Sequence, residues 1–259
     1  MNDALFIRTN NAADARRITG LAPACADRLR LVYNSLSLVV DSTAQVPMQP
    51  PVRLLAVGRF DITKGFDILL KACGILKERG RSFRLTLAGG GGTALGLGHM
   101  TQTILDLRKR LEKLVDLPGI VSHDQLPDLI RSHDIFLAPC VIHESGRRDG
   151  IPNTVIEAMS FGLPVIATNI NALPEIVRDG ETGLLIPQKD PTALAVLWII
   201  QKKPAPWGAA APHSQLTCSP PKKTETGLRL SSLKAFTGGI RNVRNSWNDR
   251  CISRRPAPR

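Results

Sequence analysis

Seven residues separate two acids, Asp149 and Glu157, in the segment "RDGIPNTVIEAM". Pro152 between them suits the first turn of a helix, where its missing N–H group costs no hydrogen bond. The pattern predicts a helix that begins near Pro152 or Asn153 and ends before Gly162. Asp149 would then stand just ahead of the helix, and Glu157 would lie in its second turn.

The start of such a helix is suited to phosphate, because free backbone N–H groups and the positive end of the helix dipole face an anion. Glu157 could accept hydrogen bonds from vicinal hydroxyls such as a ribose diol, and Asp149 could reach hydroxyls at the far end of the same ligand. The two acids would then bracket a nucleotide sugar. The spacing alone leaves a simpler alternative open, in which Asp149 favours the helix dipole and Glu157 is an exposed helix acid.

A second candidate segment, "GRFDITKG", places Gly58, Arg59 and Lys64 directly after an apolar run. Arginine binds phosphate through a bidentate fork and lysine acts as a point charge, so this pair could contact two phosphates from a fixed frame. The alternative is that Lys64 is a solvated residue before the next helix.

These segments need a frame that brings them together. The alternation of short apolar runs with amphipathic stretches predicts strands at 52–60, 83–89, 134–140, 164–169 and 183–187, and helices at 65–80, 102–116, 126–133, 153–162 and 173–180. Strands that alternate with helices pair in parallel through right-handed crossovers. We therefore expect an α/β fold with a Rossmann-like, doubly wound parallel sheet, in which ligands bind beyond the carboxyl ends of the strands.

Composition argues against several other classes of protein. The five cysteines among 259 residues are widely spaced and form no CxxC or Cys/His cluster, so we expect no metal site and a reducing compartment. The start of the chain lacks the basic and apolar regions of a signal peptide. The longest apolar run, "ALAVLWII", is far short of the roughly 20 residues that span a bilayer. We expect a cytoplasmic protein with at most peripheral contact at the inner face of the membrane.

Most of the positive charge lies in the last part of the chain. The net charge is +12, and the segment from Gln201 to Arg259 carries twelve Lys and Arg residues against two acids. This segment is rich in Pro and Ser and has few periodic apolar positions, so we expect residues 196–259 to form a disordered basic tail. Such a tail would attract phosphates without sequence preference, so no specific nucleic-acid partner is expected.

Three segments, in this order, resemble a known family: "LLAVGRFDITKGFDILLKA", "RDGIPNTVIEAMSFGLPVIAT" and "LPEIVRDGETGLLIPQKDPTALA". They are similar to the carboxy-terminal, donor-binding domain of retaining glycosyltransferases of family 4, which have the GT-B architecture. The resemblance runs from about Val52 to Ala195. The form "DGIPN" is similar to transferases that build exopolysaccharide chains, including those of the colanic-acid type.

The resemblance assigns a role to the basic segment. Gly58, Arg59 and Lys64 would bind the diphosphate of a nucleotide-diphospho-sugar, the donor substrate. Because these cations and a helix N-terminus can neutralise the leaving group, the resemblance implies that neither a metal nor a further cofactor is needed.

The family's pair of acids falls on Asp149 and Glu157, which would orient the donor sugar and the ribose, with the amides of Gly150 and Ile151 near sugar and phosphate. The sequence departs from the family at Asp149, where Glu is usual and the reach is one methylene longer. A second departure is Asn171, which stands where Gly is commoner and implies a strained backbone. A third is the glycine-rich run "GGGGTALGLGH", which replaces a tighter turn.

We expect four parts: the last helix and strand of an amino-terminal acceptor domain at 1–41, a linker at 42–51, the donor-binding domain at 52–195 and the tail at 196–259. The implied function is transfer of a sugar to a glycan or lipid-linked acceptor in exopolysaccharide or cell-surface glycan synthesis, by what would be a truncated chain. Three alternatives stay open: a catalytically inactive sugar-nucleotide-binding fragment, one half of a split enzyme whose acceptor domain is a separate chain, and a sugar-nucleotide epimerase. The epimerase would need more acid/base residues than His123, His133 and His143 supply.

Overall fold

The computed structural model describes residues 6–34, 48–91 and 98–195. The predicted tail and most of the predicted linker lie outside the described residues, as does the middle of the glycine-rich run. No helix within the described part of the chain is long and apolar enough to cross a membrane.

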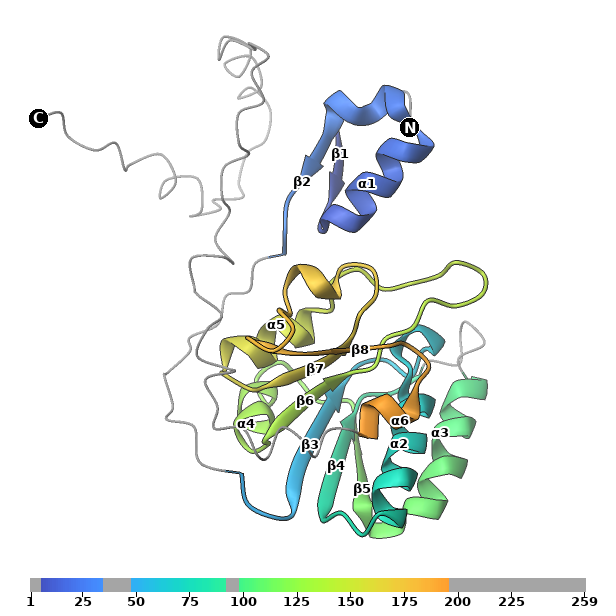
Figure 1. The fold of residues 1–259 in the computed structure, drawn as a ribbon, viewed down its shortest axis with the longest axis vertical. Helices are drawn as coiled ribbons and strands as arrows, with labels where there is room; N and C mark the ends of the chain where they lie inside the picture. Colours follow the sequence, from blue (N-terminus) through green and yellow to red (C-terminus); the bar gives the residue numbers. More distant parts are fainter. Residues whose placement is uncertain (1–5, 35–47, 92–97, 196–259) are drawn as a thin grey trace, which may run out of the picture. The chain divides into compact units, whose positions relative to one another are not determined.

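A six-stranded parallel sheet with the order β5-β4-β3-β6-β7-β8 is the centre of the fold (Figure 1). The chain runs outward from β3 through β4 to β5 and then returns to place β6 on the other side of β3. The strand order therefore reverses between β3 and β6, and the predicted doubly wound sheet is confirmed. Its strands are β3 (Val52–Val57), β4 (Phe83–Ala88), β5 (Val115–Gly119), β6 (Ile135–Ala138), β7 (Val165–Thr168) and β8 (Gly183–Ile186).

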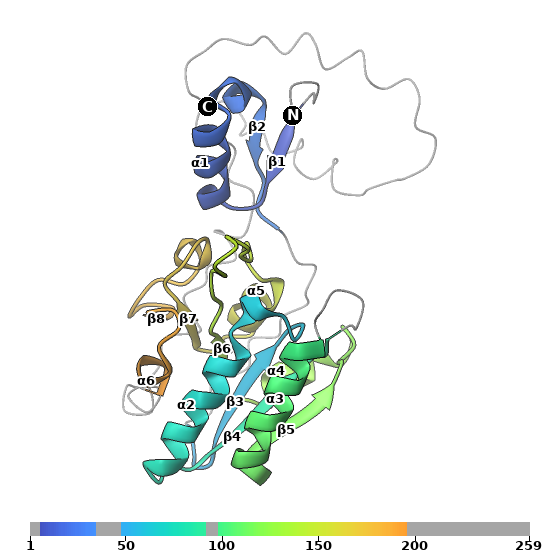
Figure 2. The same cartoon turned by 90° about the vertical axis from the view of Figure 1, so that its right-hand side faces the viewer.

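Helices cover both faces of this sheet (Figures 1 and 2). Two of them, α2 (Phe66–Glu78) and α3 (Gly98–Leu111), pack on one face, and α4 (Leu126–Arg131) and α5 (Asn153–Ser160) pack on the other. Successive side chains of β3 pack on opposite faces of the sheet. Leu54 and Ala56 pack with α2 and α3, whereas Leu55 packs with α4 and α5. Strands buried on both faces read as near-continuous apolar runs, which explains why the sequence revealed them.

The predicted helix at 102–116 is wrong at its carboxyl end. The helix α3 ends at Leu111, because Glu112 adopts a left-handed backbone conformation with a φ of 50°. A 3-10 turn, η4 (Glu112–Leu114), follows and leads into β5, a strand that the sequence analysis missed.

The predicted helix at 173–180 is also shorter in the structure, where only the 3-10 turn η5 (Leu173–Glu175) forms. The following residues turn toward β8 instead of continuing the helix, and the backbone N–H of Arg178 donates to Thr182 Oγ1 at 2.9 Å. After β8, the short helix α6 (Pro191–Leu194) packs against α2 at the end of the described chain.

The amino-terminal residues form a small parallel unit in which β1 (Ile7–Thr9) pairs with β2 (Leu29–Leu31). Between these strands lie α1 (Ala12–Leu21) and the 3-10 turn η1 (Pro23–Arg28). The sequence predicted one helix and one strand here, so β1 is an additional element. None of the residues of α1 is buried, although the carboxylate of Glu175 accepts hydrogen bonds from the first two backbone N–H groups of this helix, at 2.8 and 2.7 Å.

Candidate functional site

The candidate site segments meet where the strand order of the sheet reverses. The segment with Gly58, Arg59 and Lys64 follows β3, and the segment with Asp149 follows β6, so both leave the carboxyl ends of adjacent strands. Ligands of doubly wound sheets bind at such a switch point. The topology therefore joins segments that are far apart in the sequence.

Asp61, a buried carboxylate that the sequence analysis did not single out, orders the loop after β3. Its Oδ1 atom accepts hydrogen bonds from the backbone N–H and the hydroxyl of Thr63, each at 3.0 Å, and its Oδ2 atom accepts one from Arg147 at 2.9 Å. Burial alone would raise the pKa of Asp61, but these hydrogen bonds and the positive charge of Arg147 outweigh it and lower the pKa. Asp61 thus stays ionised and caps the 3-10 turn η2 (Ile62–Lys64). An Asp two residues before a Thr is the signal that could have revealed this cap.

Gly65, which follows that turn, allows the backbone to pack closely against the residues after β6. Its backbone is left-handed, with a φ of 64°, and a Cβ atom at this position would lie 2.0 Å from the carbonyl oxygen of Pro139. Only glycine permits both the conformation and the approach. The backbone N–H of Val141 donates to the carbonyl of Thr63 at 2.8 Å, which adds a second link between the two loops.

Lys64 and Asp149, which were expected to bind different parts of a ligand, form an ion pair. Lys64 Nζ lies 3.1 Å from Asp149 Oδ2, and the two side chains are only 14% and 22% exposed. The hydroxyl of Thr63 lies 3.3 Å from the same carboxylate oxygen. The stem of Lys64 crosses Gly58, where a Cβ atom would lie 3.3 Å from Lys64 Cε. Arg59 is exposed, and its positive charge acts on Asp61 in the same loop.

The loop that leads from β6 into α5 is held from two sides. The side-chain amide of Asn171 donates to the backbone carbonyl of Asp149, and Asn171 adopts a φ of 47°, which confirms the predicted backbone strain. Ile151 is buried in a small apolar cluster. Gly150 faces the amino-terminal segment, because a Cβ atom there would lie 3.1 Å from Asn10 Oδ1.

The helix α5 begins at Asn153, as predicted, and Pro152 is its N-cap residue. A proline side chain offers no oxygen to the first amides of a helix, so it cannot cap them. The hydroxyl of Thr154 donates to the carbonyl of Val57 at 3.4 Å, which ties the first turn of α5 to the end of β3.

Glu157 is buried, so the alternative of an exposed helix acid is wrong. Glu157 is only 4% exposed, and its Oε2 atom has no hydrogen-bond partner among the described residues. Burial raises the pKa of Glu157, and the charge of His123 lowers it in part. A buried polar atom without a partner costs on the order of 1–3 kcal/mol. Such an atom in a native structure calls for an explanation, and a ligand is one.

Two of the three histidines weighed above form hydrogen bonds within the fold. The Nε2 atom of His133 lies 2.8 Å from Thr86 Oγ1 and its Nδ1 atom 2.6 Å from the carbonyl of Leu129, while burial lowers its pKa. The Nδ1 atom of His143 lies 2.8 Å from Ser145 Oγ. The part of the chain that the structure describes contains no group of three or more His, Cys, Asp or Glu residues that could hold a metal ion.

Known proteins with similar sequences point to one family. WcaL of Escherichia coli K12, which is named as a colanic acid biosynthesis glycosyltransferase, is 33% identical over 147 residues, or 56% of this chain and 34% of that protein. AmsK of Erwinia amylovora, named as an amylovoran biosynthesis glycosyltransferase, is 33% identical over 150 residues, or 58% of this chain and 36% of that protein. The chain thus spans about a third of the length of these curated relatives.

A solved structure shares the fold. HepE of Anabaena, crystallised in complex with UDP and glucose, matches 83% of this chain and 55% of its own with a TM-score of 0.61 and 19% sequence identity. The likeness extends to the doubly wound sheet that positions the site. A family model described as glycosyl transferases group 1 matches residues 51–199, which is more than half of the sequence. The chain therefore belongs to the glycosyl transferases group 1 family.

Proposed function

We propose that the chain provides the donor-binding half of a retaining glycosyltransferase. The enzyme would transfer a sugar from a nucleotide-diphospho-sugar to the hydroxyl of a glycan or lipid-linked acceptor in exopolysaccharide or cell-surface glycan synthesis. The observation that carries the proposal is the meeting of Lys64, Asp149 and the helix of Glu157 at the switch point of the sheet. The names of WcaL and AmsK, and the UDP and glucose in the HepE crystal, support it.

The diphosphate would lie between the cationic loop and the start of α5. When the bond from the anomeric carbon to the diphosphate breaks, negative charge develops on the leaving oxygen. Arg59, Lys64 and the backbone N–H groups of Gly150, Ile151 and the first turn of α5 would stabilise that charge. The acceptor oxygen then bonds to the anomeric carbon and its proton passes to the departing phosphate.

Glu157 would bind the ribose of the donor. Its buried Oε2 atom has no hydrogen-bond partner among the described residues, and a ribose hydroxyl would supply the donor. Asp149 would orient the transferred sugar once the diphosphate has drawn Lys64 away. Retention of anomeric configuration needs such positioning more than a protein nucleophile, and it can be tested by assigning the anomer of the product by NMR.

No metal ion is needed in this proposal, because cationic side chains and a helix N-terminus supply the charge that a metal would otherwise provide. Nucleotide binding should therefore be the same before and after treatment with EDTA. Dependence on an added divalent cation would contradict this part of the proposal.

Calorimetric titration of the full chain with UDP, GDP and ADP tests the donor site and identifies the nucleotide base of the donor. Glu157→Ala and Arg59→Ala should each weaken the binding of one nucleotide at least tenfold. Matched controls are Glu78→Ala and Arg84→Ala, which change the same charges on exposed residues near the opposite end of the sheet. A folded protein that binds none of the three nucleotides would refute the donor site.

Catalysis and the division of the chain are further parts of the proposal. Residues 52–195 would form the donor-binding domain, 42–51 the linker and 1–41 the end of an acceptor domain. Nucleotide binding without transfer of a labelled sugar would favour the catalytically inactive fragment. Transfer that appears only when a separate acceptor-domain chain is added would favour the split enzyme. A cytoplasmic location with peripheral membrane contact is testable by cell fractionation.

A further inference from the structure

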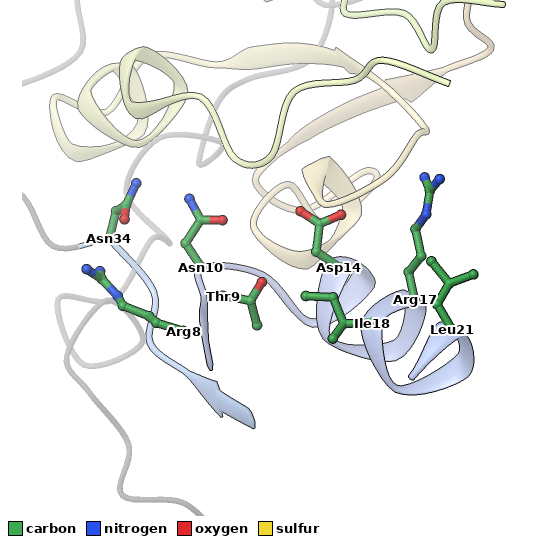
Figure 3. A pocket seen from close by; sticks show the side chains of 8 residues that line it. All are labelled: Arg8, Thr9, Asn10, Asp14, Arg17, Ile18, Leu21 and Asn34. Atoms are coloured by element: carbon green, nitrogen blue, oxygen red, sulfur yellow. The ribbon is translucent and has the colours of Figure 1, made fainter. Parts of the chain in front are cut away.

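A cavity of about 490 Å³ lies in the amino-terminal segment and is lined by residues that have no role in the proposed donor site (Figure 3). One wall is a single face of α1, because its members are spaced three and four residues apart: Asp14, Arg17, Ile18 and Leu21. The other wall comes from β1 and from the ends of the two strands: Arg8, Thr9, Asn10 and Asn34.

Two arginines in this cavity carry charges that the described residues do not neutralise. No ion pair or hydrogen bond joins the guanidinium of Arg8 or Arg17 to another described residue, and both residues are exposed. The acid among the lining residues, Asp14, accepts a hydrogen bond from the side chain of Asn11 at 2.7 Å. The cavity therefore offers two guanidinium groups, each able to bind an acid group through a bidentate fork.

The rest of the lining mixes hydrogen-bonding and apolar groups. The Oδ1 atom of Asn10 accepts a hydrogen bond from Asn11, and the Nδ2 atom of Asn34 donates one to Asn153. Each amide keeps its other polar atom, the Nδ2 of Asn10 and the Oδ1 of Asn34, for a sugar hydroxyl. Ile18 and Leu21 offer an apolar surface of the kind that covers the C–H face of a sugar ring. The lining suits a polar ligand that carries an acid group.

The cavity opens where a ligand site is expected. Asn10 follows β1 directly and Asn34 lies just beyond β2, so both stand at the carboxyl ends of adjacent parallel strands. In Figure 3 the side chains of Asn10, Asn34, Asp14 and Arg17 extend toward the same side of the segment. Asn34 Nδ2 also donates to Asn153 Oδ1 at 2.9 Å, which links the cavity lining to the first residue of α5.

We propose that this cavity binds an acidic saccharide, a sugar that bears a carboxylate or a phosphate group. Arg8 and Arg17 bind the acid group, Asn10, Asn34 and Asp14 bind hydroxyls, and the apolar residues of α1 cover the ring. Saccharide binding is a property of the cavity itself. The further step, that this saccharide is the acceptor of the transfer reaction, rests on the proposed function.

Titration of the isotope-labelled full chain by ¹H–¹⁵N NMR tests the proposal with four probes: glucuronate, glucose 1-phosphate, glucose and inorganic phosphate. At least one acidic sugar should bind tenfold or more tightly than glucose and than inorganic phosphate, and the comparison of the first two probes identifies the acid group. Arg17→Gln and Arg8→Gln should each weaken that binding at least tenfold. The matched controls Arg16→Gln and Arg30→Gln remove the same charge from neighbouring exposed positions outside the cavity and should change it less than twofold.

Three results would overturn the proposal: no saccharide binds, inorganic phosphate binds as tightly as the acidic sugar, or the control variants weaken binding as much as the cavity variants do. Titration of the same samples with UDP, GDP and ADP separates this inference from the proposed function. If a nucleotide binds but no saccharide does, the proposed saccharide binding in the cavity is refuted and the proposed donor site stands. If a saccharide binds but no nucleotide does, the proposed donor site is refuted and saccharide binding in the cavity stands.

Discussion

Replacing Asp149 by Asn should tighten the binding of a nucleoside diphosphate, although the family resemblance makes Asp149 a donor-binding residue. Asp149 holds Lys64 in an ion pair, so a diphosphate must draw Lys64 from this partner and must also approach a second negative charge. Asn has nearly the same shape and can still accept a hydrogen bond from Thr63, but it carries no charge. The substitution therefore releases Lys64 for the diphosphate.

The size of the effect follows from the geometry of the pair. Two unit charges 3.1 Å apart attract by about 5 kcal/mol at an effective dielectric constant of about 20, before desolvation and side-chain entropy are subtracted. Fully exposed pairs retain at most about 1 kcal/mol after those costs. Since these side chains are 14% and 22% exposed, we expect a net effect of about 1–2 kcal/mol, which is a factor of about 5–30 in affinity.

The assay is calorimetric titration with whichever of UDP, GDP and ADP binds the unchanged protein. The matched control is Asp106→Asn, which breaks an Asp–Lys pair of 2.9 Å on α3 and should leave the affinity unchanged. Lys64→Met should abolish most of the binding. For the complete nucleotide sugar the gain from Asp149→Asn should be smaller, because contacts of Asp149 with the sugar are lost. Nucleoside diphosphate binding that is unchanged or weaker in Asp149→Asn would refute the reasoning.

Gly65→Ala should lower the free energy of unfolding by more than about 2 kcal/mol, because a Cβ atom would meet a backbone carbonyl at 2.0 Å in a left-handed conformation. Gly74→Ala, in open space within α2, should raise it by about 0.5–1 kcal/mol, and equal effects in urea denaturation would contradict the close approach. Glu157→Gln should stabilise the fold at pH 7 by on the order of 1–2 kcal/mol, because it removes a buried charge. Since burial raises the pKa of Glu157, the unchanged protein gains stability as the pH falls through that raised pKa toward the ordinary value. Urea denaturation should therefore show that the free energies of unfolding of Glu157→Gln and of the unchanged protein become more similar at low pH. A difference that does not change with pH would contradict the burial of a charged Glu157. The thiols of Cys140 and Cys73, whose pKa values burial raises to about 11 and about 12, should resist iodoacetamide in the native protein at pH 8 and react after unfolding. Rapid native alkylation, detected by mass spectrometry, would be the opposite result.

The sequence by itself determined the class of fold and most of its elements. Central strands such as β3 and β6 are buried on both faces, and therefore appear as apolar runs that need no tertiary context. Local backbone chemistry also sufficed for the start of α5 after Pro152. The left-handed conformation of Asn171 was expected from the family resemblance, in which Gly is commoner at this position. The sequence analysis missed the edge strand β5 because the exposed face of this strand and its proline, Pro118, interrupt the apolar run.

Only the tertiary structure decided how the site residues relate to one another. Whether Lys64 touches Asp149 depends on β6 returning to the side of β3, and no local pattern in either segment contains that strand order. The burial of Glu157 likewise depends on which face of α5 meets the sheet and on what surrounds it. Secondary structure follows from interactions between near neighbours in the chain, which the sequence displays. Ion pairs and desolvation follow from distances between remote segments, which exist only once the chain has folded.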